Sequence, residues 1–212
     1  MKIACIGIGK VGSALAGNLL NAGHEVTVGA RNPDSINALS ALQHTPQLKL
    51  MTIQDAVSTA EIVFLATPFE ANKDVLWDAG QYNGKIIVDC TNPIGPGLTH
   101  LLNSVISGGE YVQRLVPDAL VVKAFTIYGY ENFIDSHYPG YGELRPAMLI
   151  AGNDNKAKES VAGLCEDLGW EPVDTGDISM SLHLEHMTLL WIKMVHLKGF
   201  GTGLTWAMLT RC

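Results

Sequence analysis

The chain has few charged and few aromatic residues, and basic side chains are the scarcer of its charges. Charged residues make up 17% and aromatic residues 7% of its 212 residues, and 14 basic side chains stand against 21 acidic ones, a formal net charge of −7. A general nucleic-acid binder needs a basic surface, so the charge argues against that class of partner. It also means that a polyanionic ligand must be held by a local group of donors.

Closely spaced cysteines and long apolar stretches are missing as well. A chain of this size can fold without disulfides, and no C-x-x-C pair is present, so we expect reduced thiols and a cytoplasmic protein. The cysteines are Cys5, Cys90, Cys165 and Cys212. The residues before Gly7 are too few for the apolar part of a signal peptide. The longest apolar stretch, 184–197, contains Glu185 and Lys193, so no membrane span is expected.

Short apolar segments alternate along the chain with segments of helical spacing. Buried strands are predicted at 3–8, 26–28, 61–66, 85–89, 121–125 and 147–151. Helices are predicted at 11–21, from Pro33, after the cap residue Thr52, at 157–168, at 182–197 and, broken by glycines, after 199. This alternation predicts an α/β fold, a Rossmann-type doubly wound parallel sheet with C-terminal helices.

We expect a single domain over residues 1–212, with its core at about 1–126. The part from about 146 to 212 is expected to complete the sheet and to form an acceptor or dimer face. The long irregular loop 135–145 is either a lid or a surface connection. The helix at 182–197 has an apolar face that completes the core of the chain or meets a second copy, and we favour a homodimer. The residues of that face are Leu184, Met187, Trp191, Met194 and Val195.

The segment after the first predicted strand has the spacing G-x-G-x-x-G. It opens a helix and starts a β-α-β unit, the context in which this spacing binds a dinucleotide. Gly7 would allow the tight turn, Gly9 would let the pyrophosphate approach the backbone, and Gly12 would let the helix pack closely on the strand. Lys10 and Val11 lie at the helix N-terminus, whose N–H groups would face the phosphates. The alternative is a glycine turn that packs helix on strand without a ligand.

The end of the second predicted strand favours NADP over NAD. An NAD site usually has Asp or Glu here, which accepts from the ribose hydroxyls, whereas this chain reads Gly29-Ala30-Arg31. Arg31 can form charge-assisted bonds to a 2′-phosphate, and Asn32 and Ser35 can add neutral donors. The alternative is a solvated surface arginine.

Three further segments follow strands whose carboxyl ends share the edge of the sheet where α/β proteins bind ligands. Two of them contain an X-Pro pair, which keeps the backbone extended or turned and able to present peptide groups to a nicotinamide and its ribose. Residues predicted to bind the cofactor here are Thr67, Pro68, Phe69, Asn92, Pro93 and Ala124. Ordinary loop punctuation is the alternative role of each proline.

These segments resemble the family of NADP oxidoreductases that depend on the deazaflavin coenzyme F-420. The resemblance is carried by 7–12, 29–31, 66–68, 84–94, 122–125, 151–154, 173–176, Leu184-Glu185 and the glycine-rich 199–203, and so runs over essentially the whole chain. The cytosolic domain of the STEAP metalloreductases, which passes NADPH electrons to a flavin, looks like a more distant relative. The resemblance implies an oxidoreductase that transfers a hydride between NADP(H) and coenzyme F-420 or a flavin-like acceptor.

Such a transfer needs alignment of two rings more than a protein acid, because the cofactors carry the chemistry. No Ser-His-Asp, Cys-His or paired-carboxylate arrangement stands out, so no catalytic residue is predicted. A carbonyl or imine reductase would need a proton donor. Its candidates are Lys123, Tyr128, His100 and His137, and a solvated or core role is favoured for each.

Two further sets of alternatives stay open. His183, His186 and His196 lie at helical spacing, but no Cys or Asp completes a ligand set, so no metal site is predicted. An NADPH-dependent flavin or ferric reductase is the second enzyme hypothesis. A redox sensor that binds NADP(H) without turnover is the hypothesis of another class.

Overall fold

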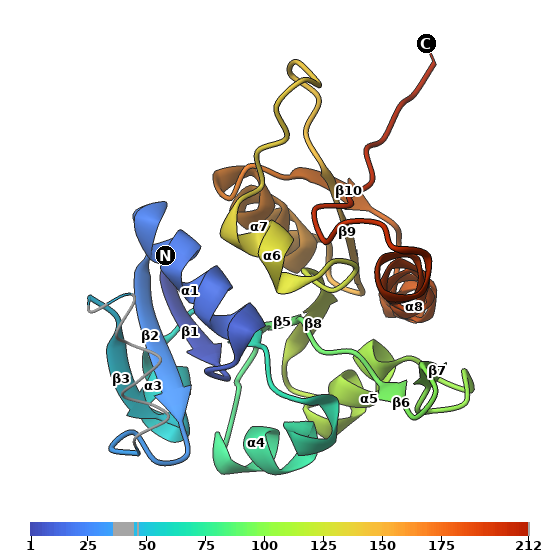
Figure 1. Ribbon diagram of the computed structural model, residues 1–212. Helices are drawn as coiled ribbons and strands as arrows, with labels where there is room; N and C mark the ends of the chain where they lie inside the picture. Colours follow the sequence, from blue (N-terminus) through green and yellow to red (C-terminus); the bar gives the residue numbers. More distant parts are fainter. Residues whose placement is uncertain (36–44, 46, 212) are drawn as a thin grey trace.

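The computed structural model describes residues 1–35, 45 and 47–211 (Figure 1). Within this part of the chain, eight strands form one sheet in the order β10-β9-β8-β5-β4-β1-β2-β3. The strands are β1 (Lys2–Ile6), β2 (Glu25–Ala30), β3 (Lys49–Thr52), β4 (Ile62–Leu65), β5 (Ile86–Asp89), β8 (Leu120–Lys123), β9 (Ala147–Gly152) and β10 (Glu171–Asp174). A separate hairpin pairs β6 (Ile94–Gly95) with β7 (Thr99–His100).

The strands from β3 to β8 pair in parallel, in the order of a doubly wound dinucleotide-binding sheet. The predicted α/β Rossmann-type fold is therefore confirmed. The prediction of a wholly parallel sheet is wrong at one edge, where β9 runs antiparallel to β8 with Gly152 opposite Val122. The segment from 124 to 146 contains the short helix α6 (Tyr130–Ile134) and a loop. A parallel return usually runs through a helix that crosses the face of the sheet, and α6 has only five residues.

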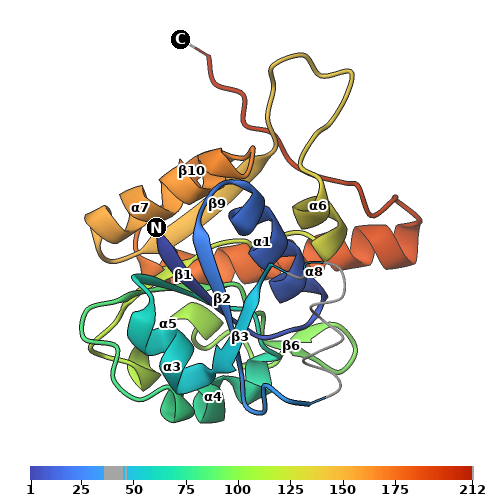
Figure 2. The ribbon, with the colours of Figure 1, turned by 90° about the vertical axis from the view of Figure 1, so that its left-hand side faces the viewer.

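Helices cover both faces of the sheet (Figures 1 and 2). On one face α1 (Lys10–Asn21), α6, α7 (Asn155–Asp167) and α8 (Ser181–Lys198) pack into a core that includes Leu15 and Val161. On the other face α3 (Ile53–Thr59), α4 (Asn72–Asp78) and α5 (Gly108–Leu115) form a second core around Val112. The predicted cap residue is confirmed, because the Thr52 side chain accepts from the Asp55 N–H at the start of α3.

Two edge strands and the last helix differ from the prediction. The sequence does not indicate β3 or β10, and both lie at edges of the sheet, where Pro172 and charged residues are tolerated. The prediction of a further helix after residue 199 is wrong, because residues 200–211 contain no helix. Gly199 takes a left-handed φ of 76° and ends α8. The helix predicted from Pro33 falls largely on 36–44, outside the described residues.

The C-terminal tail is held by hydrogen bonds instead. The Ala147 N–H donates to the Trp206 carbonyl at 2.8 Å, and Trp191 Nε1–H donates to the Leu204 carbonyl at 2.7 Å. The projecting loop 135–145 (Figure 1) and residues 203–207 line a cavity of about 190 Å³ between them. The apolar face of α8 completes the core of this chain, because Leu184, Trp191 and Val195 are buried.

Candidate functional site

The three glycines of the G-x-G-x-x-G spacing differ in what surrounds them. Gly7 has a φ of +112°, and a Cβ there would lie 2.5 Å from the Ala66 carbonyl oxygen, so the turn requires glycine. A Cβ on Gly12 would lie 2.0 Å from the Gly7 carbonyl oxygen, so α1 packs on β1 only with glycine at this position. A Cβ on Gly9 would meet nothing within 4 Å. The loop is therefore closed by Gly7 and Gly12 and open at Gly9.

The open side of this loop is the N-terminus of α1. Gly9 is the N-cap residue, no side chain caps the helix, and its first turn carries no acidic residue. The N–H groups of Lys10, Val11 and Gly12 have no acceptor within the helix, since its first internal bond to Gly9 comes from Ser13. The Lys10 ammonium lies 4.8 Å from the centre of the Tyr130 ring. These donors and the helix dipole suit an anion.

The segment that follows β2 lies beside this loop. Gly29 pairs with Ile6, the last residue of β1. Ala30 is buried, Arg31 and Asn32 are exposed, and the Asp34 N–H donates to Asn32 Oδ1 at 3.1 Å. Ser35 lies three residues beyond Asn32 and is half-buried. Arg31 and the glycine loop thus share one edge of the sheet, as the sequence predicts.

Behind the loops at the ends of β4 and β5, a chain of hydrogen bonds runs through polar side chains. Thr67 Oγ1–H donates to Asn72 Oδ1 at 2.8 Å, and Asn72 Nδ2–H donates to Thr91 Oγ1 at 2.9 Å. Thr91 Oγ1–H in turn donates to Asp89 Oδ1 at 2.7 Å. Because Asn72, Asp89 and Thr91 are buried, this chain fixes the backbone around the two predicted X-Pro segments.

A second polar group joins the ends of β5 and β8. Thr126 Oγ1–H donates to Asn92 Oδ1 at 2.7 Å, and Asn92 Nδ2–H donates to the Thr126 carbonyl at 3.1 Å. Thr188 of α8 donates to the same carbonyl at 2.9 Å and lies 3.1 Å from Asn92 Oδ1. The half-buried Asn92 is thus held in one orientation at the carboxyl edge of the sheet.

Beneath these segments lies a buried charge cluster of Lys123, Asp89, Glu185 and His100. The Lys123 ammonium, whose side chain is fully buried, is 3.0 Å from Asp89 Oδ2 and 2.9 Å from Glu185 Oε1. It also donates to the Thr91 carbonyl at 2.5 Å. These three partners together use all three protons of the ammonium group. His100 Nε2 lies 2.8 Å from Glu185 Oε2, and its Nδ1 accepts from the Ser104 N–H. His100 therefore carries its proton on Nε2 when neutral.

The other predicted site residues are placed as follows. Pro68 is exposed, whereas Pro93 and Phe69 are buried, Phe69 with its ring 5.5 Å from that of Tyr111. Ala124 is fully buried in the core, so its side chain does not face a ligand. The sequence does not predict this burial, because the residues of a strand alternate between faces and the backbone turns just past the end of β8, where Phe125 takes a left-handed φ of 52°.

The structure places Tyr128 in the core and His137 at the surface. Tyr128 donates to the Ala147 carbonyl at 2.7 Å, and the His137 side chain is 91% exposed beside Asp135. His183 and His196 are exposed, and His186 stacks on His100 with ring centres 5.6 Å apart. Within the described residues, no group of three or more His, Cys, Asp and Glu side chains could hold a metal ion.

Sequence reasoning did not assign Glu185 to the site. The available signal is an acidic residue in an otherwise apolar helical stretch, since a buried carboxylate needs partners. Its partners lie far away in the sequence: His100 is 85 residues and Gly108 is 77 residues distant.

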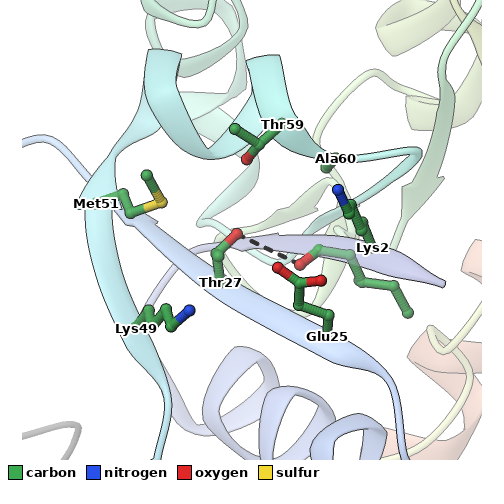
Figure 3. A pocket seen from close by; sticks show the side chains of 8 residues that line it. Lys2, Glu25, Thr27, Lys49, Met51, Thr59 and Ala60 are labelled. Atoms are coloured by element: carbon green, nitrogen blue, oxygen red, sulfur yellow. Dashed lines mark hydrogen bonds between the residues drawn. The ribbon is translucent and has the colours of Figure 1, made fainter.

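A cavity of about 190 Å³ lies at the opposite edge of the sheet (Figure 3). It is lined at the amino ends of β1, β2 and β3 and at the end of α3, with Lys2, Glu25 and Lys49 around it. Thr27 Oγ1–H donates across it to the Ile3 carbonyl at 3.4 Å. It is smaller than the roughly 300 Å³ typical of ligand pockets, and it faces away from the glycine loop.

Residues 2–93, which contain the glycine loop, Arg31 and the two X-Pro segments, match the family model for NADP oxidoreductases, coenzyme F-420-dependent. A crystal structure of an Arthrobacter sp. FB24 protein, assigned as an F-420-dependent NADP reductase, is 33% identical and covers 95% of this chain and 96% of its own, with a TM-score of 0.84. The chain belongs to this family. Membership makes it an NADP-binding oxidoreductase by family, and the predicted resemblance is confirmed.

Two further proteins are similar over most of the chain. A hypothetical protein from Sinorhizobium meliloti is 27% identical with a TM-score of 0.76, and the match covers 98% of this chain and 96% of that one. Metalloreductase STEAP3 of Rattus norvegicus is 31% identical over 89% of this chain. The chain spans only 36% of that relative. No helix of the described part of this family member has the length and hydropathy needed to cross a membrane.

The buried charge cluster predicts a specific dependence of stability on pH. Burial lowers the pKa of Lys123, but the carboxylates of Asp89 and Glu185 outweigh it and raise this pKa above its ordinary 10.5. Burial raises the pKa of Glu185, but Lys123, the Gly108 N–H and His100 outweigh it and hold this pKa below its ordinary 4.5. The contribution of Glu185 is therefore complete above pH 4.5 and is lost as the pH falls through the lower folded value.

We expect Glu185→Gln to be less stable than the parent above pH 4.5, and this difference in unfolding free energy to shrink as the pH falls below 4.5. Urea unfolding of both proteins at a series of pH values measures this difference. A difference that stays constant down to about pH 3 would show that Glu185 is not ionised in the folded protein.

Proposed function

We propose that this protein transfers a hydride between NADP(H) and a deazaflavin or flavin-like acceptor, with coenzyme F-420 as the first choice. The observation that carries the proposal is the open, uncapped N-terminus of α1 at Gly9, on the same edge of the sheet as Arg31. The strand-end segments around Thr67 and Asn92 continue this edge and would border the nicotinamide. Membership of the F-420-dependent family supports the acceptor.

The first expected outcome is that the protein binds NADPH more tightly than NADH. NADPH should bind at least about tenfold tighter than NADH, or roughly 1.4 kcal/mol, because Arg31 follows Ala30 where an NAD site carries an acid. Arg31→Ala should weaken the binding of NADPH by roughly 1.5–3 kcal/mol, the range for a charged hydrogen bond. The binding of NADH should change little. Fluorescence titration of both cofactors measures this. Equal affinities in the parent would contradict the assignment of Arg31.

We propose that no single side chain acts as an acid or base. Lys123 and His100 are buried with their polar atoms engaged, and Tyr128 donates to a backbone carbonyl. Catalysis would come from holding two rings in contact, and the acceptor nitrogen would take its proton from water. Replacing His137 or His183 singly should therefore cost less than the roughly 100-fold expected for a general acid. Single-turnover hydride transfer from deuterated NADPH tests this, and a thousandfold loss with intact binding would indicate a carbonyl or imine acceptor.

Stopped-flow oxidation of NADPH against F-420, FMN, FAD, ferric chelates and imines tests the acceptor. Rapid oxidation by F-420 is the expected result. The similarity to a metalloreductase favours a second candidate, an NADPH-dependent flavin or ferric reductase, which oxidation by FMN, FAD or ferric chelates would identify. If the protein bound NADPH but no acceptor oxidised it, the remaining hypothesis would be a redox sensor without turnover.

We also propose a homodimer in solution. Leu190 and Leu197 of α8 are 51% and 66% exposed, whereas Leu184, Trp191 and Val195 are buried in the chain. Exposed leucines on a long helix suit a two-fold contact with a second copy. Light scattering should return about twice the 22.8 kDa of one chain at micromolar concentration. A monomer mass would rule the dimer out.

A further inference from the structure

Helix α8 reaches the candidate site through two side chains that lie one turn apart. Glu185 binds the buried charge cluster, and Thr188 binds the Thr126 carbonyl at 2.9 Å and lies 3.1 Å from Asn92 Oδ1. Both side chains are buried. The segments they hold, 90–93 and 124–126, follow β5 and β8 at the carboxyl edge of the sheet.

Glu185 connects more elements than an ordinary ion pair would. Its Oε2 accepts from the Gly108 N–H at 3.0 Å and from His100, and its Oε1 accepts from the Gly109 N–H at 3.2 Å and from Lys123. The carboxylate thus lies on the N-terminus of α5, where the helix dipole favours an anion. Through these four donors it ties α8 to β7, to α5 and to the end of β8.

The local sequence is adapted to this carboxylate. A Cβ on Gly108 would lie 2.9 Å from Glu185 Oε1, 2.9 Å from Phe69 and 3.1 Å from Pro93, so any other residue would push these groups apart. Glycine at position 108 therefore lets Glu185 and Pro93, which follows Asn92 directly, both approach the start of α5 closely.

The charge count argues against a purely stabilising role. Asp89, Glu185 and Lys123 place two carboxylates and one ammonium in the interior. Apolar residues of similar volume often stabilise an interior as well as a buried ion pair does. An apolar residue at 185 would have continued the apolar pattern of α8.

We propose that Glu185 and Thr188 are positioning residues for the nicotinamide half of the cofactor. Glu185 acts through Lys123, which holds the Thr91 carbonyl, and through the α5 contact beside Pro93. Thr188 acts directly on Asn92 and Thr126. Neither contributes to the adenosine half, which would lie near Arg31 and the glycine loop. The inference rests on the proposed function.

Four variants separate positioning from folding. Glu185→Gln removes one charge and leaves Lys123 paired with Asp89, and Glu185→Asp restores the charge on a shorter side chain. Thr188→Val keeps the volume and removes the hydroxyl. Lys193→Gln, at an exposed position of the same helix, is the matched control. Each is titrated with NADPH and with adenosine 2′,5′-bisphosphate, which is NADP without its nicotinamide half, and thermal unfolding is recorded.

We expect Glu185→Gln and Thr188→Val to bind the bisphosphate within about twofold of the parent and NADPH about tenfold more weakly. Single-turnover hydride transfer should fall about 10- to 100-fold, because misplacement by about 1 Å has such an effect. Glu185→Asp should recover part of the loss, and Lys193→Gln should behave as the parent.

The other outcomes overturn the inference in recognisable ways. If Glu185→Gln and Thr188→Val weakened the binding of NADPH and of the bisphosphate equally, α8 would only support the fold. Unchanged NADPH binding and hydride transfer in Thr188→Val would show the same. A parent that binds neither ligand would refute the proposed function and this inference together. A parent that binds both ligands but reduces no acceptor would refute the proposed function alone, since the ratio of the two affinities still decides the positioning role.

Discussion

Valine in place of Gly9 is expected to abolish NADPH binding while the protein stays folded. The backbone of Gly9 has φ −73° and ψ −178°, which any residue can adopt, and its Cβ would meet nothing within 4 Å. The branched side chain would occupy the space through which a pyrophosphate approaches the N–H groups of Lys10, Val11 and Gly12. We expect a loss of at least about 100-fold, or roughly 2.7 kcal/mol. NADPH fluorescence titration and circular dichroism measure the two quantities.

The matched control is valine at Gly12, three residues further on. There the Cβ would lie 2.0 Å from a backbone carbonyl oxygen, so Gly12→Val should fail to fold, whereas Gly9→Val should lose at most about 1 kcal/mol of stability as a poorer N-cap. Normal NADPH binding by folded Gly9→Val would show that the loop is only a packing turn.

Methionine in place of Lys123 is expected to destabilise the fold strongly. The substitution would leave the carboxylates of Asp89 and Glu185 buried without a cation, and breaking a buried pair in this way costs about 3–5 kcal/mol. At about 2–4 °C per kcal/mol for a chain of this size, the melting temperature should fall by roughly 6–20 °C. Urea and thermal unfolding of the variant and the parent measure this effect.

Adding Glu185→Gln to Lys123→Met should restore part of this stability, because the double variant buries one uncompensated carboxylate instead of two. Unfolding within about 1 kcal/mol of the parent for Lys123→Met alone would mean that the ion pairs do not form. The structure gives Lys123 the core role, at the centre of the buried charge cluster. The main effect is now expected on stability.

Much of the fold and half of the candidate site follow from local patterns. The glycine spacing needs only one turn of chain: Gly7 requires its positive φ, and Gly12 lies against the backbone of Gly7 itself. The Thr52 cap acts on Asp55, three residues away. Arg31 is recognisable because the end of β2 adjoins the glycine loop in every β-α-β unit of this kind. Such features are visible in the sequence because both partners are neighbours in the chain.

Only the tertiary structure decided the direction of β9, the burial of Ala124 and the partners of Glu185. Ala124 and Thr126 both follow β8 and both are buried, and Phe125 between them takes a left-handed φ of 52° that no local pattern in the sequence indicates. Lys123 meets Asp89 across 34 residues, and His100 meets Glu185 across 85. No local pattern links residues so far apart, because their meeting depends on the strand order and on where α8 crosses the sheet edge. The sequence by itself therefore determined the glycine loop, and the packing of distant elements decided what lies beneath the ends of β5 and β8.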